Sequence, residues 1–201
     1  MPTSNSIART IELIEQRLPA LVTETRLRHI RGVVSTAEEL ARRFGVEAAP
    51  VRLAAVAHDM DRDRSAQDLL DRVAEWGIPI TPRERELPKL IHGAVSAERL
   101  RREYGIRDGT ILESVRHHTL GHPVFAEQVE PIGLILYVAD FCEPGRTNHF
   151  DRLERLGILD LGTLGKMVKE IIDLSRSVFS GLEEPTERLY ARLNCGRNER
   201  R

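Results

Sequence analysis

Residues 27–59 read LRHIRGVVSTAEELARRFGVEAAPVRLAAVAHD, and this stretch decides the fold. Apolar side chains recur in its first half at steps of three and four, the spacing of one face of an amphipathic helix: Leu27, Ile30, Val34, Ala37, Ala41 and Phe44. Gly45 is typical of the residue that ends such a helix. Pro50 suits the first turn of a following helix, which runs to His58 and Asp59. The stretch therefore predicts two consecutive helices.

Helical spacing continues through the rest of the chain. We expect further helices over residues 7–18, 65–76, 88–104, 109–118, 131–142 and 161–182. Ser65 with Asp68 resembles a capping box, and residues 78–82 predict a loop. Pro19 predicts a break after the first helix, and Pro185 predicts an interruption of the last one. The sequence has no sustained period-two alternation, internal repeat or Ser/Gly linker, so it predicts one all-α domain.

The composition excludes several classes of protein. The 201 residues include 30 Lys and Arg against 31 Asp and Glu, whereas a nonspecific nucleic-acid binder usually carries a large basic surplus. No apolar run approaches the ~20 residues of a membrane helix, and the first residues lack a signal-peptide pattern. Cys142 and Cys195 are too few for a disulfide framework. We therefore expect a cytoplasmic protein that binds neither nucleic acid nor a membrane.

The dipeptide His58-Asp59 is the strongest chemical signal. It follows the apolar run at residues 53–57, so two ionisable groups lie at the edge of the core, where leaving them unpaired is costly. One interpretation is structural: His58 hydrogen-bonds a backbone carbonyl, and Asp59 caps the next turn. The other interpretation is that both side chains bind a ligand.

Polar residues lie beside or at the ends of other apolar helices in a similar way. His29 lies beside the apolar stripe of its helix, and Gly32 one turn later suggests that another backbone approaches closely. Asp140 ends the run LILYVA, His92 follows KLI, and His118 ends a segment with three apolar residues. Several core-facing His and Asp residues on separate helices favour a shared cation.

Imidazole and carboxylate ligands suit divalent first-row metals such as Fe, Mn, Co or Zn. Four residues form a candidate site with room for water: His29, His58, Asp59 and Asp140. A water bound to such a metal can have its pKa lowered to about 7, which provides hydroxide at neutral pH. His92 and His118 could hold a second metal with Asp59 bridging, or they could bind a phosphate of the substrate. The residues alone leave both interpretations open.

The order of the motifs resembles that of a known family. R-x-x-H spans residues 26–29, H-D 58–59, H-G 92–93, H-H-T-x-G 117–121 and A-D-F-x-E-P-G-R 139–146. In this order they resemble the motifs of HD-domain phosphohydrolases. Within that superfamily the chain looks most like the bacterial symmetrical bis(5′-nucleosyl)-tetraphosphatases, over most of its length.

The resemblance implies a single HD-domain helical bundle with a metal centre in its core. It divides the chain into an N-terminal helix (residues 1–20), the metal-dependent phosphohydrolase domain (21–185) and the end of a C-terminal helix with a tail (186–201). The implied reaction is hydrolysis of diadenosine tetraphosphate to two molecules of ADP by a metal-activated hydroxide. The implied cofactor is Fe, with Mn or Co as alternatives, as one or two ions. The implied partner is a small dinucleoside polyphosphate, and a homodimer is compatible with this reading.

The resemblance also implies roles for the matching positions. The core metal ligands are His29, His58, Asp59 and Asp140. Five residues would face the substrate's phosphates: His92, Gly93, His118, Thr119 and Gly121. As an alternative, His92 and His118 would bind a second metal. Asp59 and Arg62 would act in catalysis, and Arg146 would hold phosphate through its planar guanidinium.

The chain also departs from the family pattern. Arg62 stands where a lysine is common; arginine keeps the positive charge, but its pKa above 12 prevents it from donating a proton. Asp61 and Asp63 could also engage Arg62 locally. Leu134 replaces a second lysine, and residues 147–150 differ from the family pattern. Two alternatives therefore stay open: an HD phosphohydrolase for another small nucleotide, or a non-catalytic nucleotide-binding module.

Overall fold

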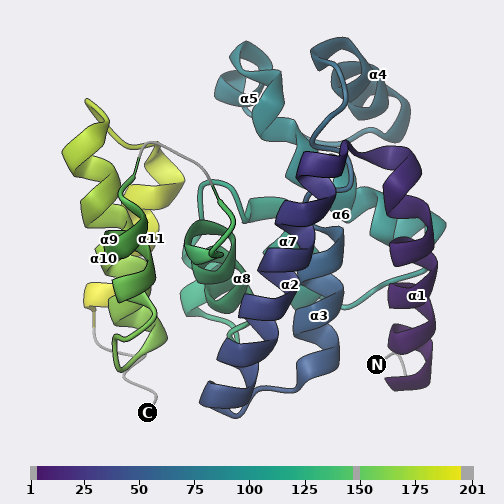
Figure 1. Ribbon diagram of the computed structural model, residues 1–201. Coiled ribbons are helices and arrows are strands. Elements are labelled where there is room, and N and C mark those ends of the chain that lie inside the picture. The colour runs from purple at the N-terminus through teal and green to yellow at the C-terminus, as the bar shows by residue number, and fades with distance from the viewer. Residues whose placement is uncertain (1–3, 147–149, 196–201) are drawn as a thin grey trace.

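The computed structural model describes residues 4–146 and 150–195, and the regular elements in these ranges are all helical (Figure 1). The α-helices are α1 (Ser4–Leu21), α2 (Glu24–Phe44), α3 (Ala48–Ala57), α4 (Ala66–Trp76), α5 (Pro82–Glu86), α6 (His92–Glu103), α7 (Gly109–His117), α8 (Ile132–Cys142), α9 (Arg152–Ile158), α10 (Leu164–Val178) and α11 (Glu184–Asn194). Two short 3₁₀ helices are η1 (Pro88–Ile91) and η2 (Pro123–Ala126). The predicted all-α class is confirmed. Within the described ranges, no helix has the length and apolar character needed to cross a membrane.

In the view of Figure 1, helix α2 lies at the front of the bundle, between α8 and α1. It packs against both α3 and α8, while α1 packs on α3, and α9 and α10 pack on α8. Thr23 caps its first turn by accepting the backbone N–H of Arg26, and Gly45 closes its last turn with a φ of 67°, which glycine adopts without strain. The end predicted at this glycine is therefore confirmed.

Two helices are buried around most of their circumference. Every residue from Ile132 to Ala139 in α8 is buried, as is every residue from Leu53 to Ala57 in α3. An apolar helix of this kind belongs inside a core. Asp140 lies in the last turn of α8, and His58 directly follows α3. Polar side chains at these helix ends therefore face the interior of the bundle.

Prolines account for most differences between the expected and the observed helices. Pro19 lies inside α1, which continues to Leu21, so the predicted break comes later. Pro82 opens α5, where a loop was expected, and a capping box of Thr81 and Glu84 supports it. Pro185 lies in the first turn of α11 instead of interrupting a helix. Because a first-turn N–H has no partner within the helix, proline is well tolerated there.

The C-terminal region is more helical than expected. The helix predicted over residues 161–182 begins at Leu164, and the separate helix α9 precedes it. Helix α11 occupies most of the segment predicted as a helix end and tail. Residues 147–149, which contribute to the predicted family departure, and the predicted disordered end at 197–201 lie outside the described residues.

Candidate metal centre

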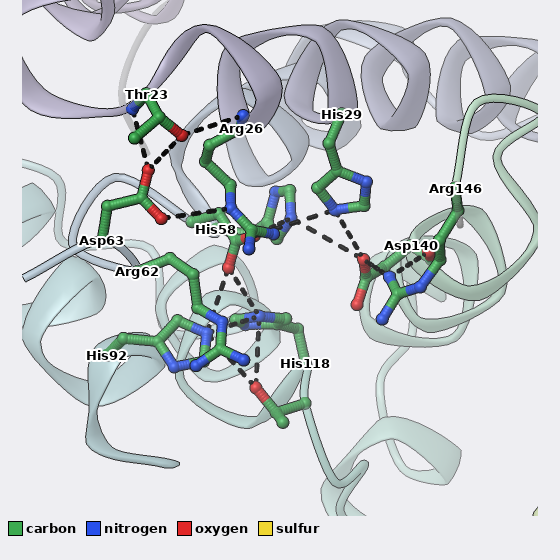
Figure 2. Close-up of polar contacts among 12 residues, drawn as sticks. Thr23, Arg26, His29, His58, Arg62, Asp63, His92, His118, Asp140 and Arg146 are labelled. Atoms are coloured by element: carbon green, nitrogen blue, oxygen red, sulfur yellow. Dashed lines mark hydrogen bonds and ion pairs between the residues drawn. The ribbon is translucent and has the colours of Figure 1, made fainter. Parts of the chain in front are cut away.

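Helix ends from across the chain meet beside the first two turns of α2 and line a cavity of about 250 Å³ (Figure 2). His29 comes from α2, His58 follows α3, His92 begins α6, His118 follows α7, and Asp140 ends α8. The structure brings these predicted residues together although up to 111 positions separate them in the chain. The predicted residues that line the cavity are His29, Asp59, Arg62, His92, His118, Thr119, Asp140 and Arg146.

Asp59 lies at the centre, and its two oxygens face different histidine pairs. Oδ1 is 3.0 Å from His92 Nε2 and 3.5 Å from His118 Nε2. Oδ2 is 3.4 Å from His58 Nε2 and 3.7 Å from His29 Nε2. The side chain is buried, so these nitrogens make up much of its surroundings. One carboxylate thus joins two groups of donor atoms.

Hydrogen bonds to the backbone fix how three of these rings present their nitrogens. In His58, His92 and His118, Nδ1 lies 2.7, 2.6 and 2.8 Å from the carbonyl oxygen three residues earlier. A carbonyl oxygen can only accept, so each Nδ1 carries the proton and each neutral ring presents a lone pair at Nε2. The structural interpretation of His58 is therefore correct, and it also prepares the ring for a ligand.

Glu143 performs the same task for His29. Its Oε1 lies 3.1 Å from His29 Nδ1, and its Oε2 accepts the backbone N–H of Gly145 at 2.7 Å. His29 Nε2 then lies 3.0 Å from Asp140 Oδ1. Glu143 belongs to the quoted E-P-G-R motif, and its spacing of three residues from Asp140 is the signal in the sequence that points to its role.

Gly32 leaves the space that Glu143 occupies. A Cβ atom at this position would lie 2.4 Å from Glu143 Oε2. The expectation of a close approach is confirmed, but the approaching group is a buried carboxylate and not another backbone. The sequence could not distinguish these cases, because both require only the absence of a side chain.

Burial and neighbouring charges shift the pKa values of the site residues in opposite directions. Burial alone would lower the pKa of His29, but the hydrogen bonds that its ring donates to Asp140 and Glu143, together with nearby negative charge, raise it to about 9. Burial would raise the pKa of Asp59, but the surrounding histidines, His58 foremost, hold it well below its usual value. The charge of Arg146 similarly holds the pKa of Asp140 low against the effect of burial. Both aspartates are therefore carboxylates at neutral pH.

The donor atoms fit a divalent cation. His58 Nε2 is buried without a hydrogen-bond partner, and the Nε2 atoms of His92 and His118 lie 3.1 Å apart. Two lone pairs at that separation, beside a carboxylate, call for a cation or a proton between them. Donors of His29, His58 and Asp59 lie within 4.8 Å of one another, as do those of Asp59, His92 and His118. This mixture of nitrogen and oxygen suits a first-row transition metal.

Three arginines border the same cavity. Arg26 donates to Asp59 Oδ2 at 2.7 Å, and Arg146 donates to Asp140. Arg62 donates to the carbonyl of Lys89 at 3.3 Å. Arg26 was part of the quoted R-x-x-H motif but was given no role; its place one turn before His29 was the signal. The cavity is thus lined both by two carboxylates, Asp59 and Asp140, and by the positive charges of the three arginines.

The aspartates beside Arg62 make other contacts than those expected. Asp61 pairs with Arg99 and Arg64, and Asp63 accepts from Thr23. The expected local engagement of Arg62 by Asp61 and Asp63 is therefore absent among the contacts of the described residues. Arg62 is left half-buried at the cavity.

The remaining predicted residues differ in position. Thr119 places its hydroxyl 3.3 Å from His118 Nε2 and 3.4 Å from His92 Nε2. Gly93 lies against the last carbonyls of α7, where a Cβ would meet Arg116 O at 2.7 Å. Gly121, with a φ of 72°, lies in the turn after α7 and lines a neighbouring cavity. Thr119 therefore contacts two histidines of the candidate metal centre. Gly93 instead lies against the end of α7, and Gly121 lies at the neighbouring cavity.

Comparison with known proteins agrees with this arrangement. The model of the HD domain matches residues 26–145. The symmetrical bis(5′-nucleosyl)-tetraphosphatase of Bacillus subtilis is 34% identical over 70% of this chain and 73% of its own, and that of Staphylococcus aureus is 31% identical over 71% and 69%. A crystal structure described as a predicted HD superfamily hydrolase involved in NAD metabolism, from Clostridium acetobutylicum, has a TM-score of 0.81 at 22% identity and covers 92% of this chain and 96% of its own, which shows the shared fold. The chain therefore belongs to the HD domain family, as a relative of the bacterial symmetrical bis(5′-nucleosyl)-tetraphosphatases.

Proposed function

We propose that this protein is a metal-dependent hydrolase that cleaves diadenosine tetraphosphate symmetrically into two molecules of ADP. One observation carries the proposal: four Nε2 atoms converge on the two oxygens of Asp59, while each Nδ1 is held by an oxygen acceptor. Such prepared donors favour a metal centre over a purely structural cluster. The names of the relatives supply the class of substrate.

The two pairs of histidines around Asp59 favour two ions, and this carboxylate would help to hold both. The first would be held by His29, His58, Asp59 and Asp140, and the second by Asp59, His92 and His118. Fe is the metal we expect, with Mn or Co as alternatives. When bound, the ions would activate water and neutralise phosphate charge. We also expect the enzyme to be cytoplasmic, and a homodimer stays a prediction.

The chain's own residues would hold the polyphosphate for attack by water. Hydrolysis joins the water oxygen to one central phosphorus and breaks its bond to the oxygen that bridges to the other. That oxygen leaves with the second ADP, and a water proton is released. Arg62 and Arg146, at the cavity, would offset charge on the phosphoryl oxygens. Because ADP leaves as a stable anion, an arginine that cannot donate a proton is tolerable at position 62.

Product identification tests the proposed reaction. Protein loaded with Mn²⁺ or Fe²⁺ and incubated with diadenosine tetraphosphate should yield two ADP per substrate, separated by chromatography. ATP with AMP, or inorganic phosphate, would contradict symmetrical cleavage. Metal-dependent nucleotide binding without any product would support the binding module instead. His58→Ala should lose both metal and activity, and retained activity would show that the site is misassigned.

Gly32→Ala tests the support that Glu143 gives to His29. The new methyl group would displace the carboxylate, so metal affinity should fall by roughly 10- to 100-fold, as when other partners of metal-binding histidines are lost. Titration of the metal-free protein with Mn²⁺ measures this. Ser35→Ala, at an exposed position of the same helix, is the matched control and should leave affinity unchanged. Equal affinities in the two variants would contradict the role of Glu143.

A further inference from the structure

A second and larger cavity adjoins the candidate metal centre. Its volume is about 640 Å³, within the range of roughly 300–1,000 Å³ typical of small-molecule sites. Thr119 lines both cavities, and its hydroxyl lies 3.3 Å from His118 Nε2. A ligand in the larger cavity could therefore extend directly to the centre.

Three segments supply most of the lining of this cavity: residues 79–84 at the start of α5, the end of α7 with the turn after it, and the start of α11, while Leu90 of η1 completes it. Arg116 donates to the carbonyl of Pro79 at 2.7 Å, and Arg83 donates to Glu183 at 2.8 Å. Thr186 donates to the carbonyl of Leu120 at 2.7 Å. These bonds connect each wall to another, so the cavity is formed before any ligand binds.

The lining combines apolar surface with a pair of stacked rings. Ile80, Leu90 and Leu120 contribute apolar side chains. His117 and His122 stack with their ring centroids 4.2 Å apart and their planes 19° from parallel. His122 Nδ1 accepts the backbone N–H of Val124 at 3.2 Å, so a neutral ring carries its proton at Nε2. The cavity thus offers flat aromatic surface, apolar contact and a donor.

We propose that this cavity binds one nucleoside of the substrate, with its base against the His117–His122 pair and its phosphates reaching past Thr119 to the metal centre. The inference rests on the proposed function, because it takes the substrate to be a nucleoside polyphosphate. A flat, apolar ring with polar edges fits the lining, and every base can stack on an aromatic side chain. The site supplies affinity for the nucleoside, whereas the first cavity supplies affinity for phosphate.

Two substitutions of His122 separate stacking from a structural role. His122→Asn keeps an acceptor for the Val124 N–H, as asparagine is a favourable capping residue, but it removes the ring. His122→Phe keeps a ring but removes the acceptor. If the ring stacks on the base, only the asparagine variant should lose affinity for ADP. If His122 has a purely structural role, only the phenylalanine variant should lose it.

Calorimetric titration of metal-loaded protein with ADP and with pyrophosphate is the test. Wild type should bind ADP more tightly than pyrophosphate. His122→Asn should weaken ADP binding roughly tenfold, in line with the loss of one base–aromatic stack, and leave pyrophosphate binding unchanged. His122→Phe should bind both ligands nearly as wild type does.

Several outcomes would overturn the nucleoside site. These are equal affinity of wild type for ADP and pyrophosphate, unchanged ADP binding in His122→Asn, or an equal loss for both ligands. Another occupant of the cavity would produce the second outcome. These titrations measure binding of ADP and pyrophosphate and involve no turnover. Failure to cleave diadenosine tetraphosphate would therefore overturn the proposed function, whereas the test of the nucleoside site would still give its own answer.

Discussion

Asp59→Asn is expected to lower the rate of ADP formation from diadenosine tetraphosphate by about a thousandfold or more, equivalent to about 4 kcal/mol of lost transition-state stabilisation. The substitution keeps the shape of the side chain. It removes the negative charge and replaces one oxygen by an amide nitrogen. This nitrogen donates hydrogen bonds but has no lone pair available for a metal ion. Either orientation of the amide turns that nitrogen toward a pair of Nε2 lone pairs, since His92 and His118 face one oxygen and His29 and His58 face the other.

Metal content distinguishes this effect from a loss of folding. Asp59→Asn should retain its helical circular dichroism but bind less metal, as measured by elemental analysis of the purified protein. Asp61→Asn is the matched control, because it makes the same chemical change at a buried aspartate two residues later. Its partners are Arg99 and Arg64, so it should lose stability but keep metal. Full metal content in Asp59→Asn would contradict its central place.

The fold and much of the site could be predicted from local patterns. A stripe of apolar residues fixes the buried face of α2, and Gly45 fixes its end, because both depend only on neighbouring residues. The same reasoning places His58 and Asp140 at the ends of buried helices. A charged group at the end of a buried helix needs a partner of opposite charge or a hydrogen-bond partner, and several such groups together imply one shared cation.

Other features depend on contacts that sequence spacing does not encode. Glu143 supports His29 across 114 positions, and nothing in either segment alone specifies the pair. Pro185 predicts a break when the residues on both sides are taken as one helix, whereas in the structure it lies in the first turn of α11, where proline is well tolerated. The larger cavity arises where three distant segments meet, so His122 could not be given a role before the fold was known.

Asp61→Ala is expected to lower the free energy of unfolding by about 3–5 kcal/mol, the cost of removing one partner of a buried ion pair, although Arg99 keeps its contact with Glu103. Asp61 is fully buried, and its two oxygens accept from Arg99 Nε and a terminal nitrogen at 2.9 and 2.8 Å. Arg99 is itself 6% exposed and lies on α6, whose first residue is His92. The pair therefore ties the turn that carries Asp59 to the helix that carries His92.

Urea unfolding of three variants separates the possible causes. Asp68→Ala, at an exposed capping aspartate, should lose much less stability than Asp61→Ala. Adding Arg99→Met to Asp61→Ala should restore part of the loss, because it removes the buried charge that has lost its contact with Asp61. Against the effect of burial, Arg99 holds the pKa of Asp61 below its usual value, so the stabilisation is present above the unfolded pKa near 4 and is lost as the pH falls. The gap between wild type and Asp61→Ala should accordingly narrow in acid, whereas a gap independent of pH would assign the loss to packing alone.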